Sequence, residues 1–246
     1  MKKIILPTTT LKQGVIEKVV MNDNLLVGST VGLVKDVNED RVGCVLNGND
    51  VKICLADGHW GEKAAEIIVG YWTKEMLLFP VNKEAAVLEV IKIEKKLFKL
   101  FGKIDMNPNS EFTPEASFIV VQLKNNILKI ISYGDCRLLI AKEGVIKTKL
   151  TTKETWLGAF SRLGLRDRIS VKKGLVFEER TLMKNDVVFV FTDGIDQCVY
   201  EKDTLSDQFL ANQTHKKSVK NIFEGILNAV FLLGAEDNAS LVVLKI

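Results

Sequence analysis

The chain has 246 residues, 47% of them hydrophobic, so it is long and apolar enough to bury a substantial core as a single domain over 1–246. Lysine and arginine number 34 against 31 aspartates and glutamates, which gives a net charge of +3. This balance gives no indication of a nucleic-acid or membrane partner. No stretch approaches the roughly 20 continuous apolar residues that span a bilayer, and Pro7 ends the short apolar start. We therefore expect a cytoplasmic protein.

The first half of the chain predicts strands followed by two helices. Strand patterns cover 15–20, 25–29, 41–46 and 51–56. Asn47-Gly48-Asn49-Asp50 joins the last two, and its Asn-Gly dipeptide strongly indicates a hairpin. Apolar residues spaced by three and four then predict helices over 61–79 and 83–101, separated at Pro80.

The second half repeats this order. A meander of strands is predicted over 117–123, 127–132, 137–141 and 145–150, followed by a loop over 151–168. Strands at 175–180 and 186–192, helices at 204–211 and 216–233, and a last strand at 239–246 complete the chain. The pattern favours an α+β protein, a four-layer αββα sandwich of two antiparallel sheets flanked by helix pairs.

Three apolar strands, far apart in sequence, run out into an aspartate, namely Asp57, Asp135 and Asp193. Any one of them alone is explained by a turn. The predicted hairpin also carries Asp40 to the same end as Asp57, because its strands are antiparallel. Carboxylates gathered at one edge repel each other unless they share a proton or a cation.

The residue types restrict the cation. The chain has only His59 and His215 as histidines, and its four cysteines stand singly in apolar runs, so a zinc site is nearly excluded and disulfides are not expected. Carboxylates suit magnesium or manganese, and the candidate acids are Glu39, Asp40, Asp57, Asp135, Asp193 and Asp237. Two such ions bridged by one carboxylate activate a water for in-line attack on phosphorus. The sequence thus predicts metal-assisted phosphate hydrolysis.

Five loops in this order and spacing resemble those of the type-2C metal-dependent protein phosphatases, the PPM family. They are 32–40, 57–61 (Asp-Gly-His-Trp-Gly), 134–137 (Gly-Asp-Cys-Arg), 192–194 (Thr-Asp-Gly) and 237–240 (Asp-Asn-Ala-Ser). The resemblance covers the chain from about Gly28 onward. It implies a four-layer sandwich that hydrolyses phosphoserine and phosphothreonine in proteins with two Mg²⁺ or Mn²⁺ ions.

The resemblance also implies metal ligands. Asp57 would bridge both ions and Gly58 would offer its backbone carbonyl. Asp193 and Asp237 resemble the ligands of one ion, and Glu39 resembles a ligand of the other.

Three further residues would act around these ions. Asp40 would orient the attacking water, and His59 would protonate the leaving alkoxide. Asp135 matches an acid that helps to bind a third, weaker ion in some members. For His59 the alternative is a surface imidazole that supports the site, and for Asp135 it is a turn held together with Arg137.

The sequence also departs from the family pattern. Lys35 stands where the family usually has a phosphate-clamping arginine, and lysine lacks the bidentate fork. Trp60 replaces a small residue, and Cys136 replaces a serine. The segment after Leu150 looks shorter than the family's flap, the part that shapes substrate choice, and it contains Arg162 and Arg166 as further candidates for phosphate binding.

Three functions remain open on these grounds. The first is an active phosphatase, expected as a monomer, with a phosphorylated protein as its partner. The second is a pseudophosphatase that binds without turnover, for which Lys35 and the altered flap are the indications. The third is a phosphatase of small molecules or of pyrophosphate.

Overall fold

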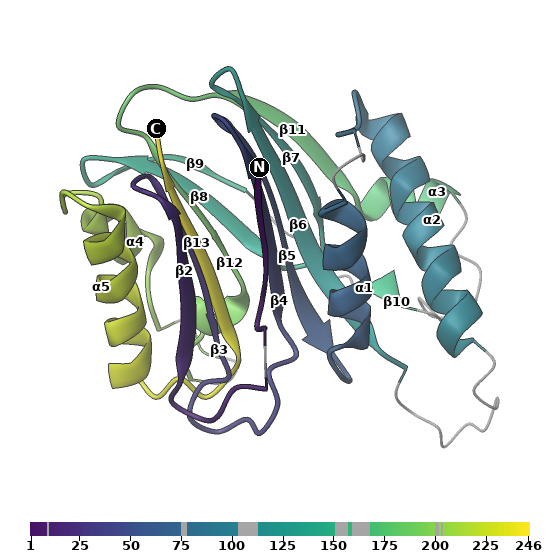
Figure 1. Ribbon diagram of the computed structural model, residues 1–246, viewed down its shortest axis with the longest axis horizontal. Helices are drawn as coiled ribbons and strands as arrows, with labels where there is room; N and C mark the ends of the chain where they lie inside the picture. Colours follow the sequence, from purple (N-terminus) through teal and green to yellow (C-terminus); the bar gives the residue numbers. More distant parts are fainter. Residues whose placement is uncertain are drawn as a thin grey trace.

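The structure is a computed structural model that describes residues 1–8, 10–74, 78–102, 113–150, 157–158, 168–199, 202 and 204–246. Two β-sheets lie face to face at its centre (Figure 1). Every strand pair that the structure describes is antiparallel.

The first sheet has the order β1-β4-β5-β6-β7-β11, with β10 paired to β6. Its strands are β1 (Lys2–Leu6), β4 (Arg41–Asn47), β5 (Asp50–His59), β6 (Glu115–Lys124), β7 (Ile127–Tyr133), β10 (Leu157–Gly158) and β11 (Val176–Thr181). The second sheet has the order β2-β3-β13-β12-β8-β9. Its strands are β2 (Ile16–Asn22), β3 (Leu25–Thr30), β8 (Arg137–Lys142), β9 (Val145–Lys149), β12 (Val187–Phe191) and β13 (Ala239–Lys245).

Helices cover the outer face of each sheet (Figure 1). The first sheet carries α1 (Lys63–Trp72), α2 (Lys83–Phe101) and α3 (Arg168–Gly174). The second carries α4 (Asp207–Gln213) and α5 (Val219–Leu232), and a 3-10 turn, η1 (Asp193–Ile195), follows β12. This arrangement confirms the predicted α+β sandwich with helices outside two antiparallel sheets.

Side chains alternate in direction along the central strands. They therefore form three buried apolar layers, one between the two sheets and one beneath the helices on each outer face. On β5, Ile53 and Leu55 face the other sheet, whereas Cys54 and Ala56 face the helices. On β12, successive residues likewise face in turn the layer between the two sheets and the layer under α5. Because both faces of these strands are buried, their sequences read as unbroken apolar runs.

Several predicted boundaries were wrong. The helix predicted over 61–79 ends at Trp72, where the Thr73 hydroxyl donates a 2.7 Å hydrogen bond back to the Val69 carbonyl. The helix predicted from 204 begins at Asp207, because the Ser206 side chain caps it by accepting from the Phe209 N–H at 3.1 Å. Residues 2–6 were not predicted as a strand, yet they pair with β4.

The loop predicted over 151–168 is only partly described. Leu157 and Gly158 form a short strand against Ala116 and Glu115, which corrects the prediction at these two positions. The other residues of 151–167, including Arg162 and Arg166, lie outside the described residues. Within the described part of the chain, no helix is long and apolar enough to cross a membrane.

Candidate functional site

The predicted acids from five separate loops gather around Asp57, near the end of β5. The hairpin pairs Arg41 with Ala56, so Asp40 and Asp57 lie at the same end, as predicted. Burial raises the pKa of Asp57 well above its usual value, and the nearby carboxylates add to the rise. Those carboxylates belong to Asp40, Asp193, Asp135 and Asp237.

Asp40 is the most deeply buried of these acids, with 1% of its surface exposed. Burial raises its pKa to about 8, whereas hydrogen bonds from Thr192 and Ser240 act in the opposite direction. The Thr192 hydroxyl donates to Oδ2 of Asp40 at 2.9 Å. Asp40 therefore has a fixed position despite the cost of burying its charge.

Asp193, the first residue of η1, comes from the second sheet. Burial, followed by the charges of Asp135 and Asp237, raises its pKa to about 6. A side-chain hydrogen bond with Asp57 and the charge of Arg137 oppose the rise. The two carboxylates that were predicted to share an ion therefore lie within hydrogen-bonding reach of each other.

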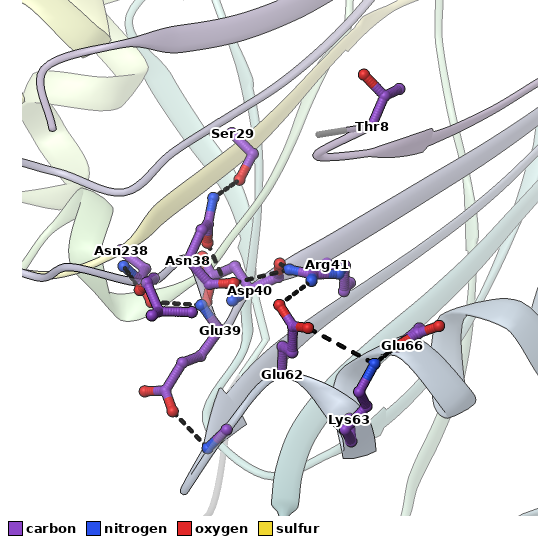
Figure 2. Close-up of polar contacts among 12 residues, drawn as sticks. Thr8, Ser29, Asn38, Glu39, Asp40, Arg41, Glu62, Lys63, Glu66 and Asn238 are labelled. Atoms are coloured by element: carbon purple, nitrogen blue, oxygen red, sulfur yellow. Dashed lines mark hydrogen bonds and ion pairs between the residues drawn. The ribbon is translucent and has the colours of Figure 1, made fainter. Parts of the chain in front are cut away.

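A network of asparagines fixes the loop that carries Glu39 and Asp40 (Figure 2). The Glu39 N–H donates to Oδ1 of Asn238 at 2.7 Å, and the amide of Asn238 donates to the carbonyls of Val31 and Val37 at 3.1 and 3.0 Å. The Asn38 side chain accepts from the Asp40 N–H at 3.1 Å. The sequence patterns indicated no role for these asparagines or for Thr192, although each stands next to a predicted acid in one of the five loops.

Two glycines allow the loops to approach closely. A Cβ at Gly58 would lie 2.4 Å from the backbone oxygen of Glu39. A Cβ at Gly194 would lie 1.9 Å from the backbone oxygen of Asn238. Side chains at these positions would push apart the segments that carry the acids.

The glutamate, histidine and lysine candidates lie around this cluster. Glu39 Oε1 accepts a hydrogen bond from the Gly61 N–H. His59 Nδ1 lies 3.3 Å from Oε1 of Glu115, and this hydrogen bond raises the pKa of the imidazole. Lys35 Nζ lies 3.3 Å from Oδ1 of Asp237, which places its charge beside a predicted metal ligand.

Asp135 has an unusual environment for a carboxylate. Its Oδ1 is buried and has no hydrogen-bond partner among the described residues. Arg137, considered above as its turn partner, forms an ion pair with the buried Asp196. An unsatisfied buried oxygen is costly, and a cation is one ligand that would satisfy it.

The donor set fits a hard cation, because it consists of carboxylate and carbonyl oxygens. The crowded carboxylates with raised pKa values and the orphaned Oδ1 of Asp135 agree with this chemistry. Within the described residues, however, no three His, Cys, Asp or Glu side chains stand in a geometry that would hold an ion. The individual ligand roles therefore stay predictions.

Comparisons with known proteins identify the fold. No protein-family model matches the chain, and no curated protein sequence matches it. Solved structures do match it along almost its whole length, and three of them illustrate the likeness.

A single-residue variant of a bacterial serine phosphatase has a TM-score of 0.72 at 16% identity, covering 92% of this chain and 100% of that one. The S. agalactiae serine/threonine phosphatase has a TM-score of 0.67 at 15% identity, covering 94% and 100%. The catalytic domain of the serine/threonine phosphatase PstP, in complex with two manganese ions, has a TM-score of 0.65 at 16% identity, covering 94% and 97%. The chain thus has the fold of bacterial serine/threonine phosphatases, which confirms the predicted resemblance at the level of the fold.

Proposed function

We propose that this chain is a metal-dependent phosphatase that hydrolyses phosphoserine and phosphothreonine in proteins with two Mg²⁺ or Mn²⁺ ions. The observation that carries the proposal is the convergence of Asp40, Asp135, Asp193 and Asp237 on Asp57, in a fold shared with serine/threonine phosphatases. The manganese ions of PstP support the same choice of cofactor. We further propose that residues 1–246 act as a single, monomeric cytoplasmic domain.

The chain's own residues would divide the binding work. Asp57, Asp193 and Asp237 would hold one ion, and Asp57, Glu39 and the Gly58 carbonyl would hold the other. Asp135 would help to hold a third, weaker ion through its buried Oδ1. The bound ions would supply a water of lowered pKa and neutralise the charge that develops on the phosphoryl oxygens.

Other residues would position the reactants and move protons. Asp40, held by Thr192, would orient the attacking water. Glu115 raises the pKa of His59, so the imidazole is suited to donate a proton to the leaving alkoxide. Lys35 would attract the phosphate, although it lacks the two-pronged geometry of an arginine.

The test is hydrolysis with manganese present. Wild-type protein should release phosphate from a phosphothreonine peptide and from an aryl phosphate, and chelation should stop both reactions. Asp193→Asn should abolish turnover, whereas Asp23→Asn, at an exposed aspartate in the turn before β3, should leave it unchanged.

The two alternatives give different results in the same assay. A pseudophosphatase would release no phosphate from any substrate. Fast turnover of nucleotides or pyrophosphate, with failure on every phosphopeptide, would replace the protein substrate with a small molecule.

A further inference from the structure

Trp60, which directly follows β5, has an unusual conformation beside the predicted site. Its φ is +63°, in the left-handed region that residues with bulky side chains avoid. Nevertheless, 47% of the residue is exposed. Core packing therefore does not account for a tryptophan at this position, and backbone outliers of this kind gather at functional sites.

The contacts on either side of Trp60 hold it at the predicted site. The ring of His59 lies 4.5 Å from the indole, centroid to centroid, at an interplanar angle of 34°. On the other side, the Gly61 N–H donates to the carboxylate of Glu39. A Cβ at Gly61 would meet no described atom within 4 Å other than those of the two adjacent residues, so the turn is open on this side.

We propose that Trp60 is a specificity-determining residue whose indole binds an apolar side chain adjacent to the phosphorylated residue of a protein substrate. This inference rests on the proposed phosphatase function. It follows from position, because a substrate whose leaving oxygen faces His59 must place a neighbouring residue close to the ring that lies against His59. Exposed indole rings gain by covering their apolar surface.

The surrounding charges favour an apolar occupant over a cationic one. The glutamates near the turn already have partners. Glu39 accepts from the Gly61 N–H, Glu115 pairs with His59, and Glu62 pairs with Arg41 and Lys63. A lysine or arginine of the substrate would therefore compete with existing ion pairs and would lie close to His59.

The experiment compares the rates of manganese-dependent hydrolysis of four substrates. Three are phosphothreonine peptides that differ only in the residues flanking the phosphothreonine, which are leucine, serine or lysine. The fourth is free phosphothreonine. Wild-type protein should prefer the leucine peptide over the other two by about five- to tenfold in kcat/KM, the range expected when part of a leucine side chain is removed from water against the ring.

Two variants then test the indole itself. Trp60→Gly should lose the preference but hydrolyse free phosphothreonine at the wild-type rate, and Trp60→Phe should keep most of the preference. Glu143→Gly provides a matched control, because Glu143 is also an exposed left-handed residue, with a φ of +50°, in the turn between β8 and β9. It should change neither rate.

The outcomes separate the two proposals. Activity on all three peptides without a preference would overturn the role of Trp60, as would a preference that persists in Trp60→Gly. An equal loss on peptides and on free phosphothreonine would assign Trp60 a structural role instead. If the wild-type protein hydrolyses none of the four substrates, the phosphatase function itself fails and this inference falls with it.

Discussion

The hydroxyl of Thr192 donates a 2.9 Å hydrogen bond to Oδ2 of Asp40, which joins the end of β12 in one sheet to the loop before β4 in the other. The same Thr192 oxygen accepts from the N–H of Ser240 at 3.0 Å. Because the N–H supplies its own proton, the single proton of the hydroxyl points at Asp40. Thr192 thereby holds Asp40 close to Asp193, the residue that follows Thr192 in the chain.

Replacing Thr192 by valine keeps the shape and removes this bridge. Thr192→Val leaves a buried carboxylate oxygen and the Ser240 N–H without their partner, so we expect it to lower the free energy of unfolding by about 1–3 kcal/mol. Thr192→Ser retains the hydroxyl and should cost less. Urea denaturation measures both variants, and equal stabilities would contradict the bridging role.

The raised pKa of Asp40 makes stability depend on pH. Its pKa is about 8 in the folded chain, against an ordinary value of 3.8. Between these values the folded state keeps a proton that the unfolded state has released, so stability falls as pH rises through this window. In the presence of a chelator, the free energy of unfolding should therefore fall from about pH 5 to about pH 8.

Asp40→Asn provides the comparison, because an amide has no proton to release in this range. Its free energy of unfolding should fall less steeply over the same window, as urea denaturation at several pH values would measure. Magnesium or manganese should stabilise the wild-type protein more at the alkaline end, where the carboxylates no longer hold protons. Identical slopes for the two proteins would show that Asp40 does not titrate as described.

Gly194→Ala tests the close approach of the loops, and Gly70→Ala provides a control within a helix. Gly194→Ala places a Cβ 1.9 Å from the backbone oxygen of Asn238, so we expect a loss of about 3 kcal/mol and weaker manganese binding. At Gly70, in α1, a Cβ would meet no described atom within 4 Å. Gly70→Ala should therefore stabilise the chain by about 0.5–1 kcal/mol. Thermal unfolding of the two variants would give shifts of opposite sign, and a wild-type melting point for Gly194→Ala would refute the packing.

Local patterns were enough to predict one half of the site. The Asn-Gly dipeptide at 47–48 predicted the hairpin, whose turn residues are Gly48 and Asn49, and antiparallel pairing then placed Asp40 beside Asp57. The apolar runs of the central strands likewise predicted where Asp193 would emerge. These inferences depend on neighbouring residues, which a sequence displays directly.

Contacts between distant segments could not be predicted in this way. Asn238 holds Glu39 from the far end of the chain, and Glu115 reaches His59 only because β6 pairs with β5 in one register. The strand at 2–6 was missed because Lys2 and Lys3 leave an apolar run of only Ile4–Leu6, and the strand is held in place by its pairing with β4. Tertiary context decides such cases.

Diffraction at the manganese absorption edge, from crystals of the protein soaked in Mn²⁺, would show whether these carboxylates hold two ions. We expect two anomalous peaks within coordination distance of Asp57, one also close to Asp193 and Asp237 and the other close to Glu39 and the Gly58 carbonyl. Crystals of Asp57→Asn treated in the same way should lose both peaks. Wild-type crystals without a peak between Asp57 and Asp193 would contradict the proposed metal centre.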